Sequence, residues 1–194
     1  MGDNVPMNSI ERSALLVIDI QDSFKEPGRW ERRNNPAFEK NVQALIDAYR
    51  RKKLPIYFFL HSDGDEGWQT TSPGYRLQSW LKMLDGETLL HKTSRNCFTT
   101  TDLGRRLTER DVTRVVVTGI QTEQCCETTA RVAADMGYDV DFVTEATLTF
   151  PAQLESGDWS QVLSAQEMVE RTEYALRRRF ARIATVDEIV AQLG

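Results

Sequence analysis

The sequence predicts an α/β protein with a three-layer α/β/α, Rossmann-like fold around a mainly parallel sheet of about six strands. Short apolar runs of strand length alternate with longer amphipathic stretches along the 194 residues. Several of these runs are apolar throughout, which favours strands buried on both faces, as in parallel sheets. The length favours one domain spanning residues 1–194, and a hydrophobic content of 40% suffices for its core.

The first half of the chain predicts three strands and two helices. Apolar residues at Val42, Leu45, Ile46 and Tyr49 have helical spacing, and Pro36 suits a first helical turn. Glycines and a proline mark residues 61–75 as a loop. We expect strands at 14–20, 55–60 and, with a weaker signal, 88–91, and helices at 36–53 and 75–84.

The second half repeats the alternation. Three consecutive valines, Val115–Val117, mark a buried strand, and Gly137 suits the position that follows a helix. The expected strands are 112–118, 139–143 and 182–184, and the expected helices are 101–110, 123–137, 163–180 and 186–193. A turn at 119–124 and a loop at 151–159 complete the order.

Composition excludes several classes of function. With a net charge of −5 and a pI of about 5.2, nucleic acid and anionic membranes are not expected partners. No run approaches the roughly 20 apolar residues of a membrane helix, and residues 1–11 lack the apolar core of a signal peptide. Three cysteines, two of them adjacent, are a poor disulfide framework and have no zinc-site spacing, so we expect a cytoplasmic protein without a cofactor.

Three reactive side chains lie near the ends of predicted strands or follow them, where open parallel sheets bind their ligands. Cys125 begins a predicted helix, so the helix dipole and a nearby Lys92 are expected to favour its thiolate. Asp19 is then the candidate base, and backbone N–H groups of the turn, including those of Gln121 and Cys125, are candidate oxyanion donors. These groups together suit acyl transfer.

Each of these residues also has a structural interpretation. A lone cysteine is most often a small core residue, a strand-ending aspartate is often a turn former, and a single lysine usually lies on the surface. Cys126, about 100° around the helix from Cys125, and Cys97 are expected in the core. The residues alone leave the catalytic and structural interpretations open.

Three motifs resemble those of the isochorismatase-like cysteine hydrolases. Residues 15–24, Leu-Leu-Val-Ile-Asp-Ile-Gln-Asp-Ser-Phe, are similar to the opening motif of the family. Residues 92–98, Lys-Thr-Ser-Arg-Asn-Cys-Phe, resemble its lysine segment, in which most members have Ser-Ala-Phe at the last three positions. Residues 119–130 resemble its nucleophile turn, and the similarity extends from about residue 12 to residue 190.

The resemblance implies an Asp19–Lys92–Cys125 catalytic triad and a covalent intermediate on Cys125. It also implies a cis peptide bond between Ile120 and Gln121, which aims the amides of Gln121 and Cys125 at the oxyanion. The expected reaction is cleavage of a C–N bond in a small amide, imide or ureide. Members are commonly homodimers or homotetramers, and we expect the same of this chain.

The resemblance leaves the substrate and the pocket open. Phe24, Trp30, His61 and Gln121 are the candidate lining residues, with Trp68 and Trp159 as further aromatic candidates. Nicotinamidases of the family carry a metal-binding Asp-x-His after the second strand, whereas this chain reads His61-Ser62-Asp63, and we expect no metal.

Three other functions are alternatives to amide hydrolysis. The first is isochorismatase-type hydrolysis of a vinyl ether, which needs no covalent cysteine. The second is a catalytically silent protein that senses or binds through a Cys125 thiol of low pKa. A dinucleotide-binding domain is disfavoured, because no Gly-x-Gly-x-x-Gly follows the first strand.

Overall fold

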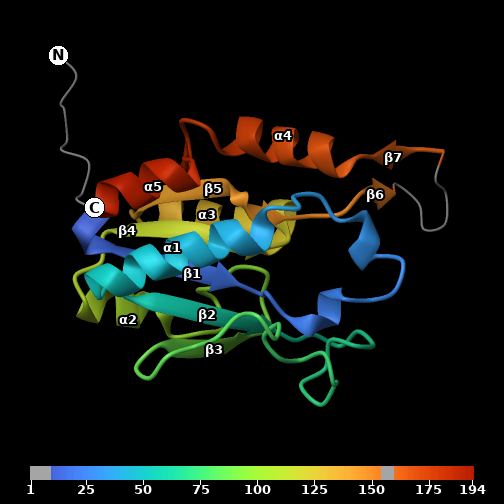
Figure 1. Ribbon diagram of the computed structural model, residues 1–194, viewed down its shortest axis with the longest axis horizontal. Helices are drawn as coiled ribbons and strands as arrows, with labels where there is room; N and C mark the ends of the chain where they lie inside the picture. Colours follow the sequence, from blue (N-terminus) through green and yellow to red (C-terminus); the bar gives the residue numbers. More distant parts are fainter. Residues whose placement is uncertain (1–9, 154–159) are drawn as a thin grey trace.

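The computed structural model describes residues 10–153 and 160–194, and its centre is a parallel sheet of six strands (Figure 1). Every pair of neighbouring strands in this sheet is parallel, and the order is β3-β2-β1-β4-β5-β8. The strands are β1 (Ser13–Ile18), β2 (Ile56–His61), β3 (Thr88–Lys92), β4 (Arg114–Ile120), β5 (Asp139–Leu148) and β8 (Arg182–Ile183). The predicted fold class is confirmed.

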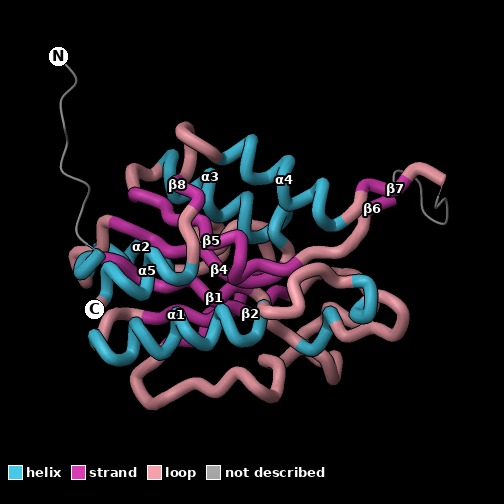
Figure 2. The backbone as a smooth tube through the Cα atoms, turned by 45° about the horizontal axis from the view of Figure 1, so that its top comes forward, coloured by secondary structure: helices cyan, strands magenta, loops and turns pink. Residues whose placement is uncertain are grey.

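Helices cover both faces of the sheet (Figure 2). One face packs against α1 (Phe38–Lys52) and α5 (Val186–Leu193). The other packs against α2 (Leu103–Glu109), α3 (Glu127–Asp135) and the end of α4 (Ala165–Leu176). In β1, Leu15 and Val17 face the first layer while Leu16 and Ile18 face the second, so the strand is apolar throughout because both of its faces are buried.

The predicted helix at 75–84 is wrong. The stretch runs as turns and extended chain, with an isolated antiparallel bridge between Leu77 and Gln21. The Gln78 N–H donates to the carbonyl of Ile20 at 3.0 Å, and the Gln78 side chain donates to the carbonyl of Gln21 at 3.3 Å. Hydrogen bonds to the loop after β1 therefore replace those of a helix.

Several element boundaries also differ from the expectation. The helix expected at 123–137 begins with a π-helical turn, Thr122–Cys126, before α3 starts. The strand expected at 139–143 continues to Leu148, and the helix expected at 163–180 ends at Leu176. The short strands β6 (Ala152–Gln153) and β7 (Val162–Leu163) form an antiparallel pair, and short 3-10 turns lie at Ile10–Arg12, Asp22–Phe24 and Trp30–Arg32.

The strand order reverses between β1 and β4, which are neighbours in the sheet although β2 and β3 separate them in the chain. In open parallel sheets such a reversal opens a crevice at the carboxyl ends of the strands. Among the described residues, no helix is both long and apolar enough to cross a membrane.

Candidate active site

The two strands at the reversal approach each other closely because residue 119 is glycine. Gly119 has φ +128°, and a Cβ at this position would lie 2.0 Å from the carbonyl oxygen of Ile18. Directly after Ile18, Asp19 adopts a left-handed backbone with φ 52°. A turn follows Ile120 and leads to Cys125, so both segments direct their side chains into the crevice.

Asp19, Lys92 and Cys125 meet at this point. The Lys92 Nζ lies 2.8 Å from an Asp19 carboxylate oxygen and donates to the Cys125 Sγ at 3.4 Å. Asp19 and Lys92 are fully buried, and Cys125 is 5% exposed. The structure thus brings together the three residues that the sequence singled out for catalysis.

Neighbouring groups hold the Lys92 ammonium in place. It donates to the carbonyls of Ser94 at 3.1 Å and Arg95 at 3.2 Å. It also lies 3.3 Å from His61 Nδ1, and His61 is its register partner on β2. Burial opposes the positive charge, but Asp19 and Cys125 outweigh it and raise the pKa of Lys92 above its usual value. Lys92 is therefore a fixed cation.

Lys92 favours the Cys125 thiolate, as expected, but other effects at the site outweigh it. Burial and the adjacent Asp19 carboxylate raise the pKa of the Cys125 thiol well above its usual value, against the opposite effect of Lys92. The N-terminal turn is also a π turn, so Cys125 does not lie in the first turn of a regular α-helix. These effects favour the protonated thiol, which lies next to a carboxylate.

The turn that carries Cys125 has an unusual backbone. The peptide bond between Ile120 and Gln121 is cis, and the N–H of Cys126 donates to the Gln121 carbonyl at 3.2 Å, closing the π turn. The Thr129 hydroxyl donates to the Cys125 carbonyl at 2.6 Å and accepts from the Cys97 N–H at 3.2 Å. Thr129 thereby ties the nucleophile turn to the lysine segment. Cys97 and Cys126 are buried in the core, where the sequence placed them.

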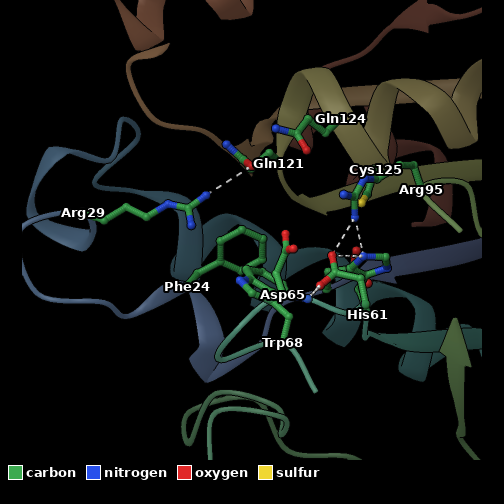
Figure 3. Close-up of a pocket in the computed structure, with 11 residues that line it drawn as sticks. Phe24, Arg29, His61, Asp65, Trp68, Arg95, Gln121, Gln124 and Cys125 are labelled. Atoms are coloured by element: carbon green, nitrogen blue, oxygen red, sulfur yellow. Dashed lines mark hydrogen bonds and ion pairs between the residues drawn. The ribbon is translucent and has the colours of Figure 1, made fainter. Parts of the chain in front are cut away.

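A cavity of about 170 Å³ opens beside Cys125 (Figure 3). Phe24, His61 and Gln121, predicted as pocket residues, line it together with Trp68. Trp30 does not belong to the lining; its ring packs against Phe150 at 6.3 Å instead. Trp159 lies outside the described residues. The other lining residues are Asp19, Arg29, Asp63, Asp65, Arg95, Gln124 and Cys125.

The pair His61 and Asp63 does not fit a metal. His61 Nε2 lies 3.2 Å from Asp63 Oδ2, and the Arg95 guanidinium contacts both side chains. A guanidinium in contact with the two potential ligands repels a cation from this position. No group of three or more His, Cys, Asp or Glu side chains in the described ranges is placed to hold a metal ion.

Five side chains at the site were not predicted from the sequence: Gln21, Arg29, Asp65, Arg95 and Gln124. Gln21 holds the end of β2: its Oε1 accepts from the His61 N–H at 2.8 Å and its Nε2 donates to the His61 carbonyl at 3.0 Å. Arg29, Asp65 and Arg95 line the cavity from loops. Gln21 and Arg95 lie within the motifs at residues 15–24 and 92–98, so these motifs could have identified them. Nothing in the sequence pattern distinguishes Arg29 from other surface arginines.

Comparisons with known proteins identify the family of the chain. The isochorismatase domain model matches residues 13–174. YrdC, an isochorismatase family protein of Bacillus subtilis (strain 168), is 27% identical over 93% of this chain and 95% of its own length. Nicotinamidase 3 of Arabidopsis thaliana is 31% identical over 73% of this chain and 76% of its own length.

A crystal structure of an isochorismatase family protein from Chromobacterium violaceum superposes with a TM-score of 0.87 at 26% identity. The match covers 100% of this chain and 99% of that one. The matched domain contains all three residues that meet in the crevice, because it spans residues 13–174. The chain belongs to the isochorismatase family and is a hydrolase.

Proposed function

We propose that the protein hydrolyses a C–N bond of a small amide, imide or ureide through a covalent acyl intermediate on Cys125. The observation that carries the proposal is the contact of one ammonium, Lys92 Nζ, with both the Asp19 carboxylate and the Cys125 sulfur, at the wall of a cavity. Nucleophile, base and cation are the groups that this reaction needs. The similarity to nicotinamidase 3, which is named for an amide substrate, supports the same reaction class.

The raised pKa of the thiol makes Asp19 the base in this mechanism. As the Cys125 sulfur attacks the carbonyl carbon, its proton passes to Asp19. The Lys92 ammonium stabilises the negative charge on the sulfur during this transfer. Asp19 then returns the proton to the leaving nitrogen, which departs as ammonia or an amine. Attack of water on the thioester, with Asp19 again as base, releases the acid and restores the thiol.

The turn after β4 supplies the oxyanion donors of the proposal. In a π turn each N–H group donates to the carbonyl five residues earlier, as the N–H of Cys126 does to the carbonyl of Gln121. This is the first such bond of the turn, and Cys125 comes one residue before it, so the amide of Cys125 is not used in a bond of this kind. Together with the amide of Gln121, it is the donor pair that we assign to the tetrahedral oxyanion.

A silent thiol sensor is the weaker alternative. Sensor cysteines are exposed and have a low pKa, whereas Cys125 is buried and its pKa is raised. Ether hydrolysis without a covalent cysteine differs in one testable respect, because it does not need the sulfur atom.

We also propose that the protein is a homodimer or homotetramer of the cytoplasm. Its three free cysteines suit a reducing compartment. Val162, Leu163 and Tyr174 are large apolar side chains left exposed on neighbouring segments, as at subunit contacts. Light scattering coupled to size-exclusion chromatography measures the assembly, and a monomer at micromolar concentration would contradict it.

The reaction is tested by measuring ammonia and amine release from a panel of small amides, imides and ureides. Wild type and Cys125→Ala are compared, with Cys97→Ala as the matched control, because Cys97 is buried nearby but does not line the cavity. Release by wild type and Cys97→Ala alone supports the covalent mechanism. Equal release by Cys125→Ala would refute it and favour a non-covalent hydrolase.

A further inference from the structure

Arg29 reaches into the cavity from the loop after β1. Its guanidinium donates to Gln121 Oε1 at 3.4 Å, and it lines the same cavity as Cys125 (Figure 3). The side chain is only 29% exposed, which is low for an arginine in a loop. The established family and the proposed reaction assign no role to this residue.

Two stacked rings lie against the guanidinium of Arg29. Its central carbon lies 5.3 Å from the centroid of the Phe24 ring and 4.8 Å from that of Phe150, and the two rings stack at 6.0 Å. A guanidinium over aromatic faces keeps its charge and loses little further freedom when it binds a ligand. Arg29 is therefore preorganised.

A further hydrogen bond orients the Gln121 side-chain oxygen that accepts from Arg29. Gln121 Nε2 donates to Glu123 Oε1 at 3.3 Å, and the other Glu123 oxygen accepts from the Thr149 hydroxyl at 2.6 Å. With its amide nitrogen turned towards Glu123, Gln121 presents its oxygen to Arg29. The guanidinium is thus hydrogen-bonded to Gln121, the residue whose backbone N–H we assign to the oxyanion.

Arg29 is the least compensated cation of the described cavity wall. Lys92, behind the wall, has Asp19 at 2.8 Å, and Arg95 has Asp63 at 3.2 Å. The ion pair of Arg29 is with Glu26 at 3.8 Å, and the Glu26 side chain is 52% exposed.

Desolvation is the largest effect on Arg29 and lowers the pKa of the guanidinium, while the carboxylates of Glu26 and Glu123 act against it. Asp65, the remaining acid of the lining, donates its backbone N–H to Asp63 Oδ1 at 3.0 Å, a bond that leaves the charge of its own carboxylate unchanged. A partly desolvated cation whose ion-pair partner is exposed to solvent favours an anionic ligand.

We propose that Arg29 binds a carboxylate of the substrate, so that the enzyme acts on small amides or ureides that also carry a carboxylate group. The inference rests on the proposed function for the reaction, and on Arg29 for the substrate class. A carboxylate matches the two parallel N–H donors of a guanidinium. The cavity volume of about 170 Å³ suits a small substrate with a few carbon atoms between the two groups.

The kinetic test compares matched substrates that differ only in charge: malonamate, succinamate and glutaramate against the corresponding neutral diamides. In Arg29→Gln we expect KM for the best monoamide acid to rise about tenfold or more, and KM for the corresponding diamide to rise much less. Arg29→Lys should recover part of the loss. Arg33→Gln is the matched control, because Arg33 also stacks on a ring of this loop, Trp30 at 4.5 Å, but does not line the cavity.

A binding test separates failure of this inference from failure of the proposed reaction. Isothermal titration calorimetry measures malonate, succinate and glutarate binding to Cys125→Ala and to Cys125→Ala/Arg29→Gln. Binding lost only in the double variant supports the carboxylate site even if no panel substrate is hydrolysed. Equal affinity in both proteins, no binding to either, or an Arg29→Gln loss that is the same for charged and neutral substrates would overturn it.

Discussion

At Cys125, burial and one carboxylate decide the protonation state. A cysteine at the start of a helix next to a lysine is expected to be a thiolate, and the sequence suggested this. In the folded protein burial, and then the Asp19 carboxylate, raise the pKa of the thiol against the opposite effect of Lys92, which pairs with Asp19 at 2.8 Å. Residue types and order predicted which three side chains meet in the crevice, but solvent exclusion, which comes from the whole fold, raises the pKa of the thiol.

Asp19→Asn is expected to change thiol reactivity and hydrolysis in opposite directions. Removing the carboxylate lowers the pKa of Cys125, because Asp19 raises it and Lys92 remains as its cation. Alkylation by iodoacetamide at pH 8 should therefore accelerate, by about tenfold for each unit by which the pKa falls while it stays above the assay pH. Hydrolysis should be lost, because the base is missing.

The labelled cysteine is identified by mass spectrometry, with Cys125→Ser as the blank. Asp22→Asn is the matched control: its carboxylate is in the same loop but pairs with Lys25 and Arg76. Slower alkylation of Asp19→Asn than of wild type would contradict the assigned role of the carboxylate.

His61 is expected to make the protein less stable in mild acid. Burial, then the Lys92 charge, lower the pKa of His61 below 6.5, while Asp19 and the Asp63 hydrogen bond act against this and Arg95 adds to it. The folded state then binds fewer protons than the unfolded state at pH values just below 6.5. The contribution of His61 to the free energy of unfolding is therefore fully present above pH 6.5, and it falls as the pH drops towards the folded-state pKa.

Urea unfolding of wild type and His61→Asn between pH 7.5 and pH 5 checks this prediction, over a range of roughly one unit either side of the ordinary histidine pKa. The slope of unfolding free energy against pH should be smaller in His61→Asn. His91→Asn, a change at the other histidine, is the control. Equal slopes in His61→Asn and wild type would disprove the assignment.

At the scale of elements, the close approach of β1 and β4 depends on one glycine. In Gly119→Ala the new methyl group meets the Ile18 backbone at 2.0 Å and the residue keeps φ +128°. We expect a loss of about 3 kcal/mol or more in unfolding free energy, because backbone on both sides must move. Activity should fall as well, since Asp19 and the Cys125 turn follow these strands.

Gly137→Ala is the matched control for Gly119→Ala. Gly137 also has a positive φ, +90°, but nothing lies within 4 Å of the added Cβ. Its cost should be about 1 kcal/mol, without an effect on kcat. Similar unfolding free energies for the two variants would contradict the argument from the Ile18 contact.

Elements were predictable from the sequence where local pattern and tertiary packing agree. The apolar run of β1 and the valines of β4 are buried on both faces, so periodicity and burial give the same result. The stretch at 75–84 failed because Gln78 is fixed by the Ile20 backbone, a contact between segments distant in the chain. The π turn before α3 was likewise not encoded in helical spacing.

At the scale of the whole molecule, the two ends of the sheet carry different groups of charged and polar residues. The catalytic candidates follow the carboxyl ends of strands, which the alternating pattern predicts, so Asp19, Lys92 and Cys125 were identifiable. Arg29 and Arg95 were not, because they come from loops whose course depends on aromatic packing. At the amino ends of β4, β5 and β8 lies an ionic cluster of buried Arg114 and Asp141 with half-buried Arg182.

This separation predicts that the ionic cluster affects stability without affecting catalysis. Asp141 is 2% exposed and pairs with Arg182 at 2.7 Å and Arg114 at 3.6 Å. Asp141→Asn leaves Arg114 buried without its counter-charge, so unfolding free energy should fall by about 3–5 kcal/mol.

The exposed pair Glu173–Arg177, 3.4 Å apart, is the matched control, and Glu173→Gln should cost less than about 1 kcal/mol. Urea unfolding measures both variants, and kcat/KM is measured at a temperature at which each is folded. We expect unchanged kcat/KM in Asp141→Asn, because no residue of the cluster lines the cavity at Cys125. A fall in kcat/KM in the folded variant would mean that the two ends of the sheet are coupled through β4 and β5.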